Sequence, residues 1–285
     1  MSIKVSDLTF TYMQGTPYEK RALDGVSFTI RDGETVGIIG ATGSGKSTLV
    51  QHFNALIKIE RGSIVVGEID LTKRKFDKMA LRKNVGMLFQ YPEMQLFEET
   101  CYKDVAFGPR NFGYSAEETD VMVKEAIEAV GLDYESFKDR EPFSLSGGEK
   151  RRIAIAGVIA SCPEILVLDE PTSGLDPVGK REMLDLIRSL KKSFVKTVVI
   201  ISHNMDEIAE YTDRVIVMSD GKVAADTTPE VLFSGTQTAE LSLGLPHSAS
   251  VYAMLKERGI DLGRVPLTAE ELAESIRGYF GGKVC

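Results

Sequence analysis

The sequence is poor in cysteine and has no long apolar run. Its 285 residues include three widely scattered cysteines, Cys101, Cys162 and Cys285, which lack metal-ligand spacing. A disulfide framework or a zinc site is therefore not expected, and a reducing cytoplasm fits best. The longest apolar runs, at 165–168 and 198–201, are too short to span a bilayer, and the N-terminus lacks the apolar core of a signal peptide. We expect a soluble chain, or one held at a membrane only through a partner.

Positive charge is also scarce. Lysine and arginine together number 34 against 42 aspartates and glutamates, which gives a formal net charge of −8. This acidic balance argues against broad electrostatic binding to nucleic-acid phosphates, although it leaves room for a local basic patch. Hydrophobic residues make up 43% of the chain, enough for a sizeable core, so the chain is not expected to be disordered.

Two kinds of strand pattern occur. Segments 8–12 and 26–30 alternate apolar and polar residues and predict an antiparallel sheet. Five other runs are almost continuously apolar, which is typical of parallel strands covered on both faces: 35–40, 85–90, 164–170, 197–202 and 214–219. Helical patterns lie between most of these runs, so the predicted fold is an α/β core beside an antiparallel sheet.

Helix signals divide the rest of the chain. Ser115 and Glu118 have the spacing of a capping box and predict the start of a helix. No strand pattern is convincing from about 91 to 163, so this segment is expected to be a helical insertion. Beyond residue 226 the texture changes to short helical segments. We therefore expect a main domain at 1–225 and a C-terminal appendage at 226–285.

The segment GATGSGKS, residues 40–47, matches the phosphate-binding pattern G-x-x-x-x-G-K-S/T and lies between an apolar strand and a helical stretch. Its glycines permit backbone conformations in which successive N–H groups converge on phosphate oxygens at the positive end of a helix. Lys46 would reach the outer phosphates, and the Ser47 hydroxyl would ligate Mg²⁺. A glycine-rich turn that binds nothing is the alternative, which the complete motif in this context disfavours.

An apolar strand ends in Asp169 and Glu170. Both acids are therefore expected at the carboxyl edge of the parallel sheet, where α/β proteins bind ligands. One acid can hold a metal ion while its neighbour polarises a water. A charged strand end that only caps the next element is the alternative, and the preceding phosphate loop favours the functional interpretation.

Other candidates are weak when taken alone. Gln90 and His203 each end a predicted strand, where a lone histidine is more often structural. Tyr12 is expected to pack in the core, with stacking on a purine as the alternative. Residues 146–148, Ser-Gly-Gly, precede a helix and offer an anion site, although they are also ordinary loop residues. Arg151 and its neighbour are compatible with a solvated helix face.

These residues occur in a distinctive order: the phosphate loop, Gln90, LSGGE at 145–149, LDEPTSGLDP at 168–177 and ISH at 201–203. The ordered set, over about residues 3–225, resembles the nucleotide-binding domain of ATP-binding cassette (ABC) proteins. The resemblance implies a P-loop NTPase fold of ABC type with a RecA-like core, an antiparallel β subdomain, a helical subdomain and a short C-terminal extension. It also implies an ATPase whose ligands are ATP and Mg²⁺.

The resemblance assigns roles residue by residue. Glu170 is similar to the general base, His203 to the switch histidine at the γ-phosphate, and Tyr12 to the aromatic residue that stacks on adenine. Lys46 and Gln90 complete the catalytic set, with Gln90 contacting metal and attacking water. The implied metal ligands are Ser47, Gln90 and Asp169. The implied nucleotide contacts are Tyr12, Gly40, Ala41, Thr42, Gly43, Ser44, Gly45, Lys46, Ser47 and Thr48.

Ser146, Gly147 and Gly148 match the signature that, in this family, closes over the ATP held by the opposite subunit. The resemblance therefore implies a pair of homologous ATPase subunits, either identical or different, with nucleotide between them. Residues 173–176 match the D-loop. Glu149 departs from the family, which usually has glutamine there, and its carboxylate is expected to weaken the composite site slightly.

The stretch FQYPEMQLFEETCYKDVAFGPRN, residues 89–111, closely resembles the ATPases of energy-coupling factor (ECF) transporters, which import vitamins and metals in prokaryotes. It is most similar to the second of their two paired ATPases. In ABC transporters this region forms the groove for helices of the membrane subunit, whereas a solvated loop is the alternative. We expect Glu93, Glu98 and Glu99 to form an acidic rim of this groove. Leu96 and Phe97 would form its apolar floor. Gly108 and Pro109 would form a fixed bend that returns the chain to the core.

The predicted function is ATP-driven uptake of vitamins or other micronutrients. The chain would be peripheral on the cytoplasmic face of the cell membrane, with a homologous ATPase, a transmembrane coupling subunit contacting about 90–111 and a separate substrate-binding membrane subunit as partners. A soluble ABC ATPase of the cluster-assembly type is the alternative. A DNA-repair ATPase is disfavoured because no sustained heptads occur, and a tandem translation-type ATPase because there is no second phosphate loop.

Overall fold

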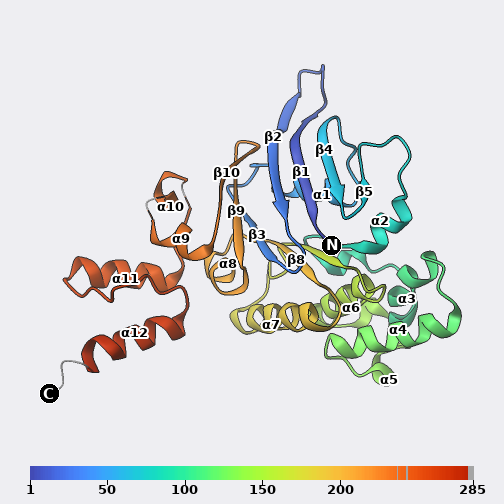
Figure 1. Cartoon of the computed structure of the whole chain (residues 1–285). Helices are drawn as coiled ribbons and strands as arrows, with labels where there is room; N and C mark the ends of the chain where they lie inside the picture. The colour runs from blue at the N-terminus through green and yellow to red at the C-terminus, as the bar shows by residue number, and fades with distance from the viewer. Residues whose placement is uncertain (236, 242, 282–285) are drawn as a thin grey trace.

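The computed structural model describes residues 1–235, 237–241 and 243–281. Its smaller sheet is antiparallel with strand order β2-β1-β4-β5 (Figure 1). The strands are β1 (Ile3–Tyr12), β2 (Lys20–Ile30), β4 (Arg61–Val66) and β5 (Ile69–Asp70). β1 and β2 contain the two alternating segments and pair antiparallel, so this part of the fold prediction is confirmed.

The larger sheet has the order β10-β9-β3-β8-β7-β6. Its strands are β3 (Thr35–Ile39), β6 (Val85–Leu88), β7 (Ile165–Asp169), β8 (Thr197–Ile201), β9 (Arg214–Ser219) and β10 (Lys222–Thr227). The strands from β9 to β6 run parallel, and β10 pairs antiparallel with β9. Every residue of β3, β7 and β8 is buried, which explains their continuous apolar runs and confirms the predicted α/β class.

The chain between β6 and β7 is helical in the described structure. It forms η1 (Pro92–Gln95), α3 (Cys101–Asn111), α4 (Ala116–Ala129), α5 (Tyr134–Phe137), η2 (Pro142–Ser144) and α6 (Gly147–Ile159). The capping box of Ser115 and Glu118 is present at the start of α4.

The bend predicted at Gly108 and Pro109 is wrong, because α3 continues through both residues to Asn111. Gly108 has a different purpose. A Cβ atom there would lie 3.0 Å from Ser161 Oγ and 3.5 Å from the Gly157 carbonyl oxygen. Glycine therefore allows α3 to approach α6 closely.

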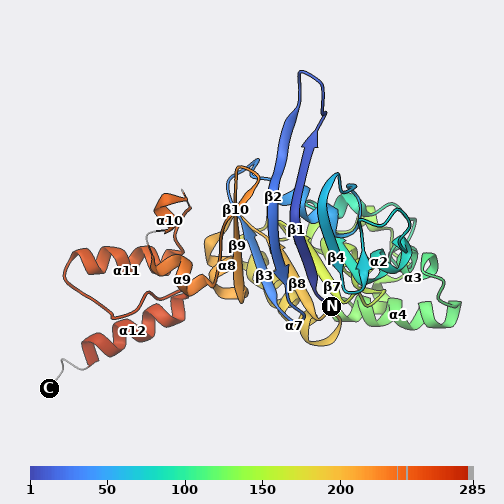
Figure 2. The same cartoon turned by 45° about the horizontal axis from the view of Figure 1, so that its top comes forward.

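The remaining helices cover the sheets or extend away from them. α1 (Lys46–Phe53), α2 (Lys78–Asn84), α7 (Pro177–Ser193) and α8 (Met205–Tyr211) belong to the body. α9 (Pro229–Ser234), α10 (Gln237–Glu240), α11 (His247–Glu257) and α12 (Ala269–Gly281) form an arm that projects from it (Figures 1 and 2). Every helix in the described residues is too short or too polar to cross a lipid bilayer.

The arm packs on the body through an apolar cluster that joins Leu232 and Phe233 of α9 to Ile208 of α8. Ion pairs between described residues add to this contact. His247 pairs with Asp206 at the start of α8, and Arg181 of α7 lies 3.4 Å from Glu270 of α12. Cys101 and Cys162 are free thiols, whereas Cys285 lies outside the described residues.

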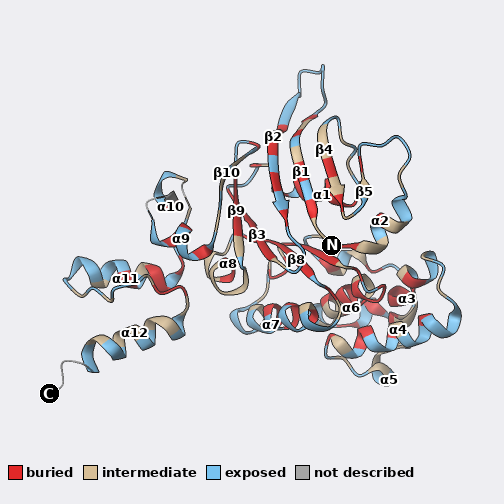
Figure 3. Ribbon diagram, in the orientation of Figure 1, coloured by how far each residue is buried: buried red, intermediate tan, exposed pale blue. Residues whose placement is uncertain are grey.

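α1 joins the two sheets, because its buried residues pack with strands of both. Leu49, Val50 and Phe53 share one apolar cluster with Ile3 of β1 and Ile38 of β3. Burial is concentrated where the sheets and helices meet, while much of the surface of α11 and α12 is exposed (Figure 3). The helix that follows the phosphate loop is thus fixed by the core itself.

Phe53→Ala should lower the free energy of unfolding by about 3–5 kcal/mol, because it removes a fully buried ring and leaves a cavity between the sheets. Chemical denaturation monitored by circular dichroism measures this change. Leu56→Ala, at a position that is 48% exposed, is the matched control and should change stability little. Equal effects of the two substitutions would contradict the packing role of Phe53.

Candidate active site

The loop between β3 and α1 depends on two glycines. Gly40 and Gly45 have φ angles of 142° and 103°, which residues with a side chain rarely adopt. A Cβ atom would lie 2.1 Å from the Met218 carbonyl oxygen at Gly40, and 2.4 Å from the Ala22 carbonyl oxygen at Gly45. The backbone therefore reaches its turn only without side chains, and the loop opens directly into the N-terminus of α1.

Lys46 lies across this loop. Its ammonium donates to the carbonyl oxygens of Gly40 at 2.9 Å and Ala41 at 3.0 Å. Burial lowers the pKa of Lys46, and the nearby carboxylates of Glu170 and Asp169 counteract this effect. The lysine is thus a nearly buried cation beside two acids at a helix N-terminus, an arrangement that suits a polyanion.

Asp169 ends β7 and is 9% exposed. Burial raises the pKa of Asp169, while a hydrogen bond from the Ser47 hydroxyl and the charge of Lys46 oppose the shift. Ser47 and Asp169 therefore present a hydroxyl and a carboxylate oxygen side by side. This small set of oxygen donors fits Mg²⁺, which usually takes few protein ligands and keeps several waters.

Three strand ends converge on the Glu170 carboxylate. Gln90, after β6, donates from Nε2 to Glu170 Oε2 at 3.0 Å. His203, after β8, has its Nε2 atom 3.1 Å from Glu170 Oε1. Glu170 itself has a φ angle of 51°, an uncommon conformation that turns the chain just after the strand. The parallel order β6-β7-β8 thus brings together three residues that are far apart in the sequence.

One cavity of about 570 Å³ joins these groups to the phosphate loop. Tyr12 lines it and is 39% exposed, with its hydroxyl 3.1 Å from Thr48 Oγ1 and its ring packed edge-on against Phe10. The expected core packing of Tyr12 is therefore only partial. Lys20, at the start of β2, also lines the cavity. The sequence carried no local signal for Lys20, because the pairing of β1 with β2 places it there.

The described residues 146–148 do not line this cavity. Ser146 caps α6 in a capping box, in which its Oγ atom accepts from the Glu149 N–H at 3.4 Å and its own N–H donates to Glu149 Oε2 at 2.8 Å. The Ser146 hydroxyl also donates to Glu149 Oε2 at 2.7 Å. Arg140 lies 3.5 Å from the other Glu149 oxygen. Hydrogen bonds from Ser146 lower the pKa of Glu149. The carboxylate thus occupies donors that would otherwise face an anion at this helix end.

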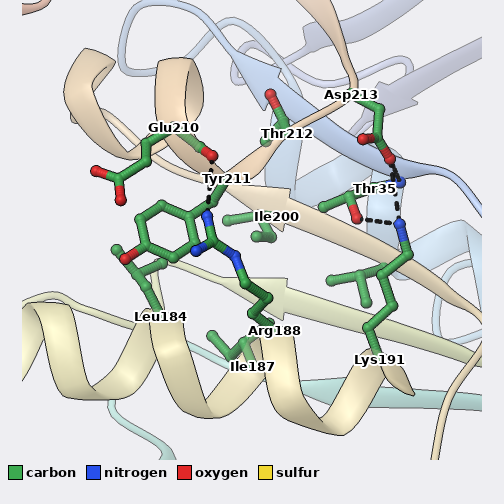
Figure 4. A pocket seen from close by; sticks show the side chains of 11 residues that line it. Thr35, Leu184, Ile187, Arg188, Lys191, Ile200, Glu210, Tyr211, Thr212 and Asp213 are labelled. Atoms are coloured by element: carbon green, nitrogen blue, oxygen red, sulfur yellow. Dashed lines mark hydrogen bonds and ion pairs between the residues drawn. The ribbon is translucent and has the colours of Figure 1, made fainter. Parts of the chain in front are cut away.

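A second hollow, of about 220 Å³, lies between α7 and α8 at the opposite edge of the larger sheet (Figure 4). Its cations already have partners. Lys191 Nζ donates to Thr35 Oγ1 at 2.6 Å and lies 3.1 Å from Asp213, while Arg188 lies over the Tyr211 ring at 4.3 Å. None of the site residues expected from the sequence lines this hollow. The chemistry therefore concentrates at the carboxyl edge.

Comparisons with known proteins agree with this geometry. A family model described as ABC transporter matches residues 23–173. The chain is 48% identical over 285 residues to the energy-coupling factor transporter ATP-binding protein EcfA2 of Clostridium tetani, covering 99% of each chain. It is 46% identical over 279 residues to EcfA2 of Enterococcus faecalis, covering 97% of this chain and 96% of the relative.

Solved structures give the same result. CbiO1 from Clostridium perfringens, described as part of the ABC transporter complex cbiONQ, has a TM-score of 0.73 and 36% identity, covering 90% of this chain and 96% of its own. The ATP-binding cassette MJ0796, described as a dimer bound to ADP and Pi, has a TM-score of 0.70 and 29% identity. The match covers 80% of this chain and 98% of the MJ0796 chain. The chain therefore belongs to the ABC transporter family, among the energy-coupling factor transporter ATP-binding proteins.

Proposed function

We propose that the ATPase activity of this transporter subunit takes place in the cavity around Lys46, with Glu170 as the general base. The convergence of Gln90 and His203 on the Glu170 carboxylate, in a cavity that Lys46 also lines, carries the proposal. The transporter ATP-binding relatives disfavour the soluble, cluster-assembly alternative.

Residues 40–48, which include Lys46, hold the triphosphate, and Tyr12 stacks on the adenine. Ser47, Asp169 and Gln90 would hold Mg²⁺, which would neutralise phosphate charge. Glu170 orients the attacking water and accepts its proton, while His203 contacts the γ-phosphate. Catalysis in this arrangement consists mainly of positioning and electrostatic stabilisation.

The subunit works as half of a pair, with a homologous ATPase or a second copy. The signature residues 146–148 lie outside the cavity of their own chain, which supports a role at the nucleotide of the opposite subunit. The related MJ0796 cassette is described as dimeric. Glu149 adds negative charge at this helix end and lowers the affinity of that composite site.

The chain divides into a nucleotide-binding domain at 1–225, with its helical subdomain at about 91–163, and a C-terminal extension at 226–285 that helps to hold the pair together. Apolar side chains that are exposed on the projecting arm support this role. Val231, Val251, Met254 and Phe280 are 56%, 41%, 63% and 48% exposed, respectively.

A transmembrane coupling subunit docks on residues 90–111, and a separate membrane subunit binds the vitamin or other micronutrient. A groove of about 240 Å³ supports this docking site. Phe97 and Phe107 line the groove, are 58% and 47% exposed, and pack edge-to-face at 4.9 Å. The subunit is thereby held peripherally at the cytoplasmic face of the cell membrane.

The acidic rim expected at this groove needs revision. Glu93 lies 3.4 Å from the buried Arg151 guanidinium, and Glu99 lies 2.5 Å from Lys103. Glu98 has no ion pair among the described residues, so it is the acid best placed to meet a partner's arginine. Leu96 lines the groove at 6% exposure, as expected of a floor residue, and Phe97 and Phe107 are its exposed apolar side chains.

Glu170→Gln should reduce the turnover number by about 10²–10⁴, because a positioned base is lost, while ATP still binds and holds the pair together. Phosphate release and gel filtration with ATP measure the two effects. Glu164→Gln, at the opposite end of the same strand, is the control and should retain turnover. Unchanged turnover in Glu170→Gln would remove this residue from its proposed role.

Lys46→Ala should weaken nucleotide binding by about 10- to 100-fold, since a charge-assisted contact with phosphate is worth roughly 1.5–3 kcal/mol. Titration with a fluorescent ATP analogue measures the dissociation constant. Lys4→Ala, on β1, serves as the control. Equal affinities of Lys46→Ala and the unmodified protein would show that the lysine does not contact the phosphates.

The double substitution Phe97→Ser with Phe107→Ser should abolish recovery of the transmembrane coupling subunit after mild detergent extraction, because the apolar contact surface is lost. Mass spectrometry identifies the retained membrane proteins. Val121→Ser, an exposed residue of α4, is the control and should keep the partner. Retention of the same membrane protein by the double variant would place the docking surface elsewhere.

A further inference from the structure

Glu207, on α8, is a buried carboxylate that has no part in the mechanism given above. It is 5% exposed and forms no salt bridge with any described residue. A buried carboxylate needs hydrogen bonds to offset the loss of water. Two hydroxyls supply them: Thr172 donates to Oε1 at 2.8 Å and Ser202 donates to Oε2 at 2.7 Å.

The two hydroxyls belong to two different segments of the active site. Thr172 lies two residues after Glu170, and Ser202 immediately precedes His203. Both are nearly inaccessible, at 5% and 3% exposure. Glu207 therefore connects the segment that follows the proposed base to the strand end that presents the proposed switch histidine.

Ser202 is held on a second side. Its Oγ atom accepts from the Asn204 N–H at 3.0 Å while its proton goes to Glu207. The Glu170 N–H also donates to the Ile201 carbonyl oxygen at 3.0 Å, so the two strand ends are already in register. The carboxylate completes this arrangement by fixing the side chains just beyond the backbone contact.

The bridge lies directly beside the reacting groups. A hollow of about 300 Å³ is lined by Glu170 and His203 and also by Thr172, Ser202 and Glu207. Glu207 contacts neither reacting side chain by hydrogen bond or ion pair in the described structure. Its hydrogen-bonded route to them passes through the two hydroxyl residues.

We propose that Glu207 is a positioning residue that couples the segment 172–176 to His203, so that the base and the switch histidine keep their mutual geometry during turnover. The proposal rests on the roles of Glu170 and His203 proposed above. The carboxylate sets the separation of 3.1 Å between His203 Nε2 and Glu170 Oε1 indirectly, by holding both of their chain segments.

Glu207→Gln tests the coupling with little change in side-chain volume. An amide has one acceptor oxygen, so one of the two hydroxyls loses its acceptor. Turnover should fall about 10- to 100-fold, the scale expected for a small misplacement of catalytic groups, while the KM for ATP and the melting temperature change little. Glu210→Gln, on the same helix, is the control and should behave like the unmodified protein.

Variants of the hydroxyl partners separate coupling from simple stabilisation. Ser202→Ala and Thr172→Val should each lower turnover, whereas Ser202→Thr, which keeps the hydroxyl, should retain most of it. In the Glu207→Gln background, Ser202→Ala should lower turnover by less than it does alone. Thr119→Val is the matched control, because Thr119 is buried and its hydroxyl has no partner in the described structure. These variants also provide the test if Glu207→Gln does not fold.

Glu170→Gln measured in parallel distinguishes the two levels of the proposal. Loss of turnover in Glu170→Gln with full turnover in Glu207→Gln would overturn the positioning role alone. Full turnover in both would overturn the proposed base. A loss in Glu207→Gln that matches a lower melting temperature and a smaller fraction of active sites would show that Glu207 only stabilises the fold.

Discussion

The active site depends on the close approach of backbone to backbone at Gly40 and Gly45. At these two positions a side chain would overlap carbonyl groups of β9 and β2, which belong to different sheets. The turn between β3 and α1 is therefore defined by both sheets together. Because α1 also packs between those sheets through Phe53, the loop and the core together fix the direction of this helix.

The strand order provides the second half of the site. β6, β7 and β8 are adjacent and parallel, so the residues just beyond their carboxyl ends meet without any local sequence relation. Gln90, Glu170 and His203 are brought into contact in this way. The left-handed backbone at Glu170 turns the chain immediately after the strand, and uncommon conformations of this kind are concentrated at functional sites.

Four candidate residues could be placed on one edge of the sheet from the sequence, because each lies at or just beyond the end of an apolar strand and the parallel strands end together there: Gln90, Asp169, Glu170 and His203. The roles assigned to them stay predictions. Contacts that depend on tertiary packing could not be predicted in this way. Lys20 enters the cavity through strand pairing, and Gly108 serves close helix packing where a bend was expected. Arg151, whose charge suggested a solvated face, is 3% exposed and donates to the carbonyl oxygens of Pro171 and Ser173.

The contacts of Lys46 with its own loop have a consequence for the end of the cycle. The Gly40 and Ala41 carbonyl oxygens both accept from the ammonium. If Lys46 binds phosphate as proposed, a departing product leaves the ammonium with these two acceptors, which reduces the free energy that opposes release. These loop contacts would thereby lower the affinity for nucleotide and favour product release in each catalytic cycle.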